Sequence, residues 1–250
     1  MKPDLSEFSY GFALTSELIQ SCHLQSLGAP IFPSLKAEGR TGGGYDVKLP
    51  FIPVFLQYKL SEYLTTRRAL DFNRFGGPYY RFKLRALSYS KQHELLLELE
   101  KKWSSVYYSA PRFHTSSELN KAFALGRVRK QSVFVRPSSI GVLPDESEHT
   151  VSFTVSGMTG ILRSEPVEIE LHDDEVFESV VSMNSITGGS REYRALADQL
   201  LDLYFEIASP NIDKDWYALK EQASNRSPQE YVRMITMSLF DCELLVRHAG

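Results

Sequence analysis

Three residues near the start of the chain, Asp46, Gln57 and Lys59, have side chains suited to hydrolysing a phosphate ester. They lie in the segment GGGYDVKLPFIPVFLQYKLS, residues 42–61. A carboxylate oxygen and an amide oxygen are hard ligands that suit Mg²⁺, an ion that keeps several of its waters. An ammonium two residues after the amide can orient or deprotonate a water, or offset charge on a phosphate in the transition state. The pattern therefore predicts metal-assisted cleavage of a phosphodiester bond.

Two short strands would have to position these side chains. The alternation of apolar and polar residues predicts strands over 45–49 and 54–60, and the LPFIP segment between them predicts a short turn. Antiparallel strands joined in this way form a hairpin whose facing side chains lie within reach of one another. We therefore expect the carboxylate, the amide and the ammonium to converge on one face of the hairpin.

The rest of the chain has the pattern of a mixed α/β protein, with α and β elements interspersed. Further strands are expected over residues 79–87, 106–113, 132–137, 149–157 and 161–171. Helices are expected over residues 9–22, 90–103, 116–128, 190–208 and 227–248. The LPDESE segment interrupts the pattern near residues 140–150. It favours a core over residues 1–140 and an acidic extension, first β and then helical, over residues 141–250.

The motif formed by Asp46, ten intervening residues and Gln57-Tyr58-Lys59 resembles that of the PD-(D/E)XK nuclease superfamily, which has the restriction-endonuclease-like fold. In that superfamily the acid sits on one strand of a hairpin and (E/Q)-x-K on the next. The resemblance covers roughly the first half of the chain. It implies an αβββαβ core with a mixed central sheet over residues 9–113, including a strand near 32–38.

The resemblance also implies a role for each residue of the motif. Asp46 would be the main metal ligand. The side-chain oxygen of Gln57 or the backbone carbonyl of Tyr58 would fill the second metal position, and Lys59 would be the catalytic lysine. The implied cofactor is Mg²⁺, with Mn²⁺ as a substitute. Glutamine in place of the second acid removes one negative charge, which should weaken metal binding.

A glutamate from the first helix or the first strand often completes the site in this superfamily. Glu17 on the helix over 9–22 and Glu38 before the glycines are the two candidates, and both stay open. Glu17 ranks slightly ahead because it lies beside the apolar face that must dock on the sheet. Tyr45 stands where the superfamily motif has proline, which is a common departure.

Two other interpretations of the motif stay open. In the first, Asp46 accepts hydrogen bonds from the glycine turn, and Gln57 and Lys59 belong to a solvated face. In the second, a nuclease-like fold has lost its activity and serves as a nucleic-acid-binding or protein-assembly module. A surface salt bridge at Lys59 would favour such a non-catalytic role.

Basic residues interleaved with aromatic ones follow the motif. The predicted nucleic-acid contacts are Arg67, Arg68, Arg81, Lys83 and Arg85. Tyr79, Tyr80 and Phe82 lie among them, and phosphate contacts combined with base stacking would suit this composition. An ordinary amphipathic strand with charged outer positions explains the pattern equally well.

Charge is distributed unevenly along the chain. Residues 1–130 carry 19 Lys and Arg against 11 Asp and Glu, whereas residues 131–250 carry 9 against 20. The basic half predicts an anionic partner, which we expect to be DNA, with RNA left open. The acidic half is a candidate docking surface for a protein partner. Proteins of the fold that the motif resembles often serve in restriction, phage defence or repair.

The composition predicts a globular protein with a sizeable core, since 42% of the residues are hydrophobic and 24% are charged. Cys22 and Cys242 are the only cysteines, so no disulfide framework is expected. No run of eighteen apolar residues predicts a membrane-spanning helix, and the N-terminal segment lacks the pattern of a signal peptide. A cytoplasmic location is the resulting expectation.

Overall fold

A computed structural model describes most of the chain. The described residues are 1–21, 24–25, 54–86, 90–103, 105–143, 148–163, 166–175, 190–207, 226–240 and 242–247. Asp46, Glu38 and the strands expected over 32–38 and 45–49 lie outside these residues. Gln57 and Lys59, in contrast, fall within them.

The strands in the described part of the chain form two five-stranded sheets, and the first sheet is mixed. Its order is β1 (Leu24–Gln25), β10 (Glu243–Arg247), β2 (Val54–Tyr58), β5 (Val106–Pro111) and β6 (Ser132–Val135). β2 and β5 run parallel, and the other neighbouring strands are antiparallel. Every residue of β2 is buried, as expected for a strand covered on both faces.

The second sheet is antiparallel throughout. Its order is β3 (Glu62–Leu64), β4 (Tyr79–Leu84), β7 (His149–Phe153), β8 (Thr159–Arg163) and β9 (Val167–Glu170). β4 shows why this segment forms a strand with one apolar face. Phe82 and Leu84 are buried, whereas Arg81 and Lys83, which alternate with them, are not, and this is the period of two of a strand.

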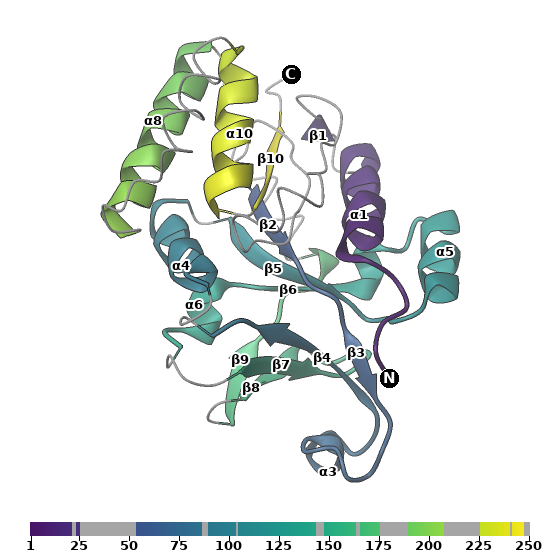
Figure 1. Cartoon of the computed structure of the whole chain (residues 1–250). Helices are drawn as coiled ribbons and strands as arrows, with labels where there is room; N and C mark the ends of the chain where they lie inside the picture. Colours follow the sequence, from purple (N-terminus) through teal and green to yellow (C-terminus); the bar gives the residue numbers. More distant parts are fainter. Residues whose placement is uncertain are drawn as a thin grey trace.

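Helices cover both faces of the first sheet (Figure 1). On one side lie α1 (Glu7–Ser21) and α5 (Ser116–Ala124), and on the other α4 (Gln92–Lys102), α8 (Ser190–Ile207) and α10 (Pro228–Phe240). The connections contain the short helices α3 (Phe72–Phe75), α6 (Pro137–Ile140) and the 3₁₀ helix η1 (Arg129–Gln131). Among the helices of the described residues, none is long and apolar enough to cross a membrane.

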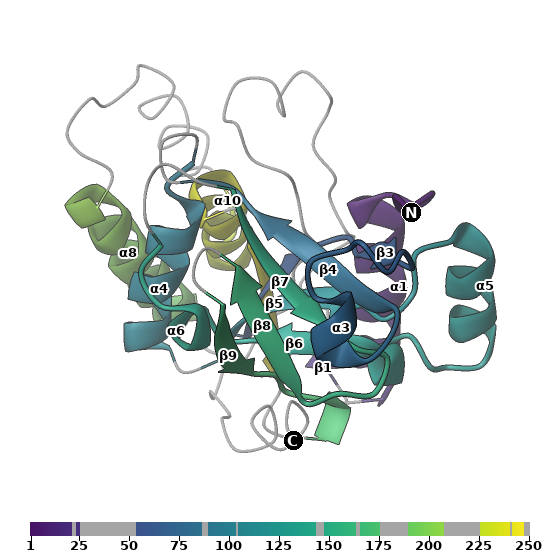
Figure 2. The same cartoon turned by 90° about the horizontal axis from the view of Figure 1, so that it is seen from below.

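The two faces of β2 belong to two separate apolar cores. Val54, Leu56 and Tyr58 pack in the core under α1, whereas Phe55 packs in the core shared with α4, α8, α10 and the second sheet. Figure 2 shows β4, β7 and β8 stacked in front of β5 and β6. The approach of α1 requires a glycine, because a Cβ atom on Gly11 would lie 2.5 Å from Cδ2 of Tyr58.

The mixed α/β class expected from the sequence is confirmed by these sheets. The expected hairpin between residues 45–49 and 54–60 is wrong at Phe55 and Leu56. At these two residues β5 pairs with one edge of β2 and β10 pairs with the other edge. Neither edge is therefore left for a hairpin partner.

The helix expected over residues 227–248 is wrong in its last part. α10 ends at Phe240, and Glu243–Arg247 form β10 beside β2. The aliphatic ELLVR segment pairs with the edge of a central strand and buries Leu244, and this long-range pairing outweighs the local helical pattern.

The second half of the chain contributes strands to both sheets. β7, β8 and β9 continue the sheet begun by β3 and β4, and β10 lies between β1 and β2. The described strands within residues 141–250, where an acidic extension was expected, are therefore interleaved with strands of the first part of the chain.

Candidate functional site

Gln57 lies in β2 and Lys59 directly follows its last residue. Both side chains project from the side of the strand that faces α4. Side chains alternate along an extended chain, so both share the direction of Phe55 and point away from α1. Gln57 lies opposite Tyr108 of β5, and the Lys59 N–H continues the ladder by donating to the Ser109 carbonyl at 2.8 Å. Gln57 is fully buried and Lys59 is 9% exposed. Two polar side chains therefore lie inside the protein at the end of β2.

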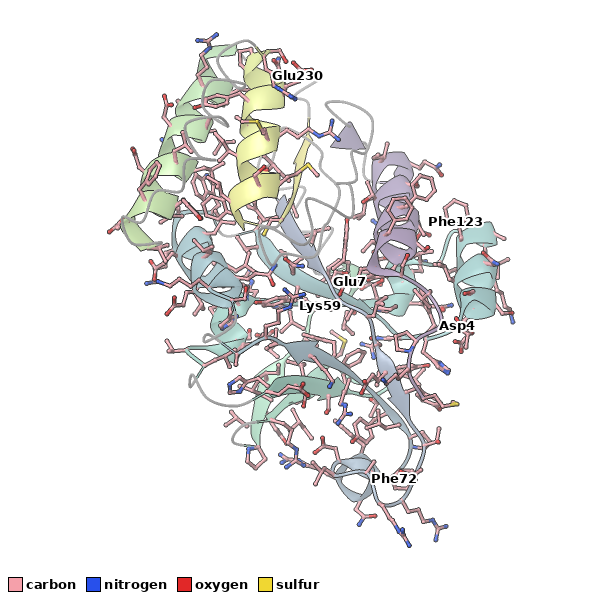
Figure 3. The ribbon with its side chains drawn as sticks, in the orientation of Figure 1. Asp4, Glu7, Lys59, Phe72, Phe123 and Glu230 are labelled. Atoms are coloured by element: carbon pink, nitrogen blue, oxygen red, sulfur yellow. The ribbon has the colours of Figure 1, made fainter. Side chains whose placement is uncertain are left out.

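Gln92, the first residue of α4, binds both of these side chains. Its Nε2 donates to Oε1 of Gln57, and its Oε1 accepts a long hydrogen bond of 3.5 Å from Nζ of Lys59. The helix starts at this point with the hydroxyl of Ser90 accepting a 3.2 Å hydrogen bond from the Gln92 N–H. Figure 3 shows Lys59 beside α4. The start of α4 thus brings an amide to the end of β2.

Tyr108, which contacts Lys59, and its partner His93 form a neutral aromatic pair. The ammonium nitrogen of Lys59 lies 5.9 Å from the centre of the Tyr108 ring. His93 Nε2 lies 2.7 Å from the Gly141 carbonyl, which can only accept, so Nε2 carries the proton. Nδ1 then accepts from the Tyr108 hydroxyl at 2.9 Å. Burial lowers the pKa of His93, against the opposing effect of the Gly141 bond, so the imidazole stays uncharged.

Lys59 has no carboxylate partner among the residues that the structure describes. Its contacts there are the Gln92 amide and the face of the Tyr108 ring. A cation removed from water is costly unless an opposite charge compensates it. The described part of the site therefore lacks a counter-charge, which a phosphate group or a carboxylate such as that of Asp46 would supply.

Glu17 lies on the opposite side of the first sheet. Its Oε2 accepts a 2.5 Å hydrogen bond from the backbone N–H of Arg129, and its helix α1 packs on the other face of β2. The Arg129 side chain is itself buried, and its guanidinium forms an ion pair with the carboxylate of Asp174. The structure therefore brings Gln57 and Lys59 together and places Glu17 away from them.

The described residues offer only neutral oxygens to a metal at this site. The Tyr58 side chain points toward α1, where its hydroxyl shares a 2.7 Å hydrogen bond with Thr15. The backbone carbonyl is therefore the Tyr58 oxygen that is left to act as the predicted metal ligand. Gln57 Oε1 keeps a second lone pair. No group of three or more His, Cys, Asp or Glu in the described ranges could hold a metal ion. A magnesium site here therefore depends on an acid outside them, such as Asp46 or Glu38.

The basic residues of β4 are paired with carboxylates. Arg81 donates to Glu62 through two N–H groups at 2.9 and 2.7 Å, and Nζ of Lys83 lies 2.8 Å from Glu148. These are the contacts of an amphipathic strand with charged outer positions, the alternative that the sequence pattern left open. The other predicted nucleic-acid contacts, all exposed, are Arg67, Arg68 and Arg85.

Gln92 and Tyr108 were missed by sequence reasoning. Both lie in elements that the periodicity predicted, the helix over 90–103 and the strand over 106–113. One polar or aromatic residue within a regular element gives no periodic signal of its own. Only the position of Gln92 at the start of the helix that follows the motif could have drawn attention to it.

No protein-family model matches the chain, and no curated protein and no solved structure shows significant similarity to it. Functional inference for this protein therefore depends on the geometry of Gln57, Lys59 and Gln92.

Proposed function

We propose that this protein is a metal-dependent nuclease of the PD-(D/E)XK type, which hydrolyses phosphodiester bonds in DNA. The observation that carries the proposal is the Lys59 ammonium, which is 9% exposed, lies beside the Gln57 amide and has no carboxylate partner among the described residues. A lysine with a structural role pairs at the surface, as Lys83 does with Glu148. Burial without a described counter-charge instead supports the binding of an anion.

In this proposal Lys59 acts on the phosphate and on the attacking water. Its ammonium donates hydrogen bonds to a phosphate oxygen and offsets the charge that develops on that oxygen in the transition state. It also orients the attacking water. Asp46, Gln57 and the Tyr58 carbonyl would hold Mg²⁺, which supplies Lewis-acid activation of water and phosphate when it is bound.

The order of the elements supports the proposal, because it matches the second part of the αβββαβ order of a restriction-endonuclease-like core. β2, α4 and β5 follow one another as strand, helix and parallel strand, with the β3–β4 hairpin inserted before the helix. The β10 ladder ends at Leu56, one residue before Gln57. The proposal therefore requires Asp46 to approach Gln57 beyond the end of β10. It assigns the completing acid to Glu38, because Glu17 is bound to Arg129 on the opposite face.

Cleavage of supercoiled plasmid and single-stranded DNA tests the proposal. We expect the wild-type protein to cut in Mg²⁺ or Mn²⁺ and not in EDTA. Lys59→Ala should lose about 10²-fold to 10⁴-fold of the rate, the usual contribution of a positioned acid–base group. Lys101→Ala is the matched control, since that lysine is exposed on α4 in an ion pair with Glu98, and it should cut like the wild type. Metal-dependent cutting that persists in Lys59→Ala would place the activity elsewhere and contradict the proposal.

One observation favours the alternative, a nuclease-like fold that binds nucleic acid without cutting it. Gln92 binds both the Gln57 oxygen and the Lys59 ammonium, so each of these groups already has a hydrogen-bond partner within the protein. Fluorescence anisotropy with a labelled single-stranded oligonucleotide distinguishes the two functions. Binding that weakens steeply with salt, without cleavage in either metal, would establish the binding module.

A further inference from the structure

One amide side chain connects the two described residues of the predicted catalytic motif. Gln92 lies 35 residues after Gln57 and 33 after Lys59, so the contact depends on the tertiary fold. Its Nε2 and Oε1 are used separately, the first as donor to Gln57 and the second as acceptor from Lys59. Each end of the amide therefore recognises a different site residue.

The donor end of Gln92 determines which way the Gln57 amide is turned. An amide has an acceptor oxygen and a donor nitrogen of nearly the same shape, so only its partners distinguish the two orientations. Because Gln92 donates, Gln57 turns Oε1 toward α4, and its Nε2 turns to the Tyr58 carbonyl at 3.4 Å. The oxygen that would bind the metal is thereby fixed in direction.

The acceptor end of Gln92 limits where the Lys59 ammonium can lie. Lysine has a flexible stem, and its ammonium would otherwise sample several positions. Here Nζ lies 3.5 Å from Gln92 Oε1 and 5.9 Å from the centre of the Tyr108 ring. α4 itself is held in place, because Leu95, Leu96 and Leu99 are buried in the core.

We propose that Gln92 is a positioning residue, which fixes the Gln57 oxygen and the Lys59 ammonium relative to each other. This role rests on the proposed nuclease function. Gln92 acts through these two residues, as groups behind metal ligands and catalytic side chains commonly do. Its loss should therefore weaken metal binding and cleavage while leaving the fold in place.

Gln92→Met tests this role, because methionine has a similar length and forms neither hydrogen bond. Gln20→Met is the matched control, since Gln20 is exposed on α1. The first measurement is made without metal or DNA, from the ¹H–¹⁵N resonances of the Gln57 side-chain amide, which should shift in Gln92→Met only. Calorimetric titration with Mn²⁺ should then show a dissociation constant raised about 10-fold to 100-fold. Cleavage should fall by a similar factor, and the control should stay within about twofold of wild type on both measurements.

The outcomes separate this inference from the nuclease function. If the wild type cuts DNA and Gln92→Met keeps both the Mn²⁺ affinity and the cleavage rate of the wild type, the positioning role alone is overturned. Faster cleavage by Gln92→Met would overturn it too, because the contact would then be inhibitory. A wild-type protein that cuts no DNA in either metal would overturn both the function and the role. Thermal melting shows whether each variant is folded, and Gln92→Leu replaces the methionine variant if that one is not.

Discussion

The two sides of the first sheet bury polar groups in opposite ways. On the α1 face, the Arg129 guanidinium binds the Asp174 carboxylate, and the backbone N–H of Arg129 binds Glu17. On the α4 face, the Lys59 ammonium meets an amide and an aromatic ring, without a carboxylate in the described part of the chain. One face thus buries a cation with its counter-charge, and the other buries a cation beside neutral groups.

This difference separates a structural site from a candidate functional one. A buried cation with a bound carboxylate is electrostatically complete, and its residues hold α1, η1 and the segment after β9 together. A buried cation that faces neutral groups is stable only if something else supplies the charge. Proteins depart from the rules of stability mainly where function requires it. The α4 face is therefore where we expect a ligand.

Arg129→Met should produce the largest effect on stability. The substitution removes the Arg129 guanidinium from the buried Asp174 carboxylate, and breaking such an ion pair costs about 3–5 kcal/mol. Lys59→Met should leave the free energy of unfolding unchanged or raise it, since no described carboxylate loses a partner. Urea unfolding of both variants checks the contrast. An equally large loss in Lys59→Met would show that Lys59 is structurally paired, and it would remove the distinction between the faces.

Gly11→Ala should have the next largest effect, because the α1 face is packed without space. The new Cβ atom would lie 2.5 Å from Cδ2 of Tyr58, whose ring is fully buried and whose hydroxyl is bound to Thr15. Overpacking of this kind costs about 1–3 kcal/mol, which outweighs the gain in helix propensity. Thermal melting should show the loss. Gly77→Ala is the control, since no atom lies within 4 Å of its added Cβ, and it should melt like the wild type.

The smallest effect concerns the dependence of stability on pH. Burial lowers the pKa of His93 below its ordinary value of 6.5, so the folded protein resists protonation there. As the pH falls through about 6.5, the unfolded chain takes up a proton that folded His93 does not, and the free energy of unfolding decreases. His93→Gln should therefore lose less stability than the wild type between pH 7 and pH 5 in urea unfolding. Parallel curves for the two proteins would mean that folded His93 takes up its proton as readily as the unfolded chain does, which would contradict the lowered pKa.

Local sequence patterns predicted the strands and helices of the site more accurately than they predicted which elements pack against one another. The alternation over residues 54–60 correctly placed Gln57 and Lys59 on one face, because side chains in a strand repeat every second residue. The helix over 90–103 was predicted from its apolar face and is observed as α4, Gln92–Lys102. Glu17 was ranked from its position on α1, but the alternation could not say which face of the sheet α1 would cover.

Pairing between distant segments could not be predicted in the same way. The edge of β2 at Phe55 and Leu56 was assigned to a nearby hairpin, and β10 from the C-terminal end of the chain occupies it. β2 and β10 are both aliphatic strands, and nothing in either local sequence marks the other as its partner. The same holds for Gln92, whose contacts with Gln57 and Lys59 arise from the docking of α4 on the first sheet.

By itself, the sequence determined which side chains of this protein share a strand face and where its main helices run, because both follow from periods of two and 3.6 residues. Only the tertiary structure decided that Gln57 and Lys59 are buried, that Gln92 binds both, and that Glu17 lies on the other face. These outcomes depend on which distant segments bury their apolar faces together. The free energy of that burial belongs to the whole core and not to any one segment.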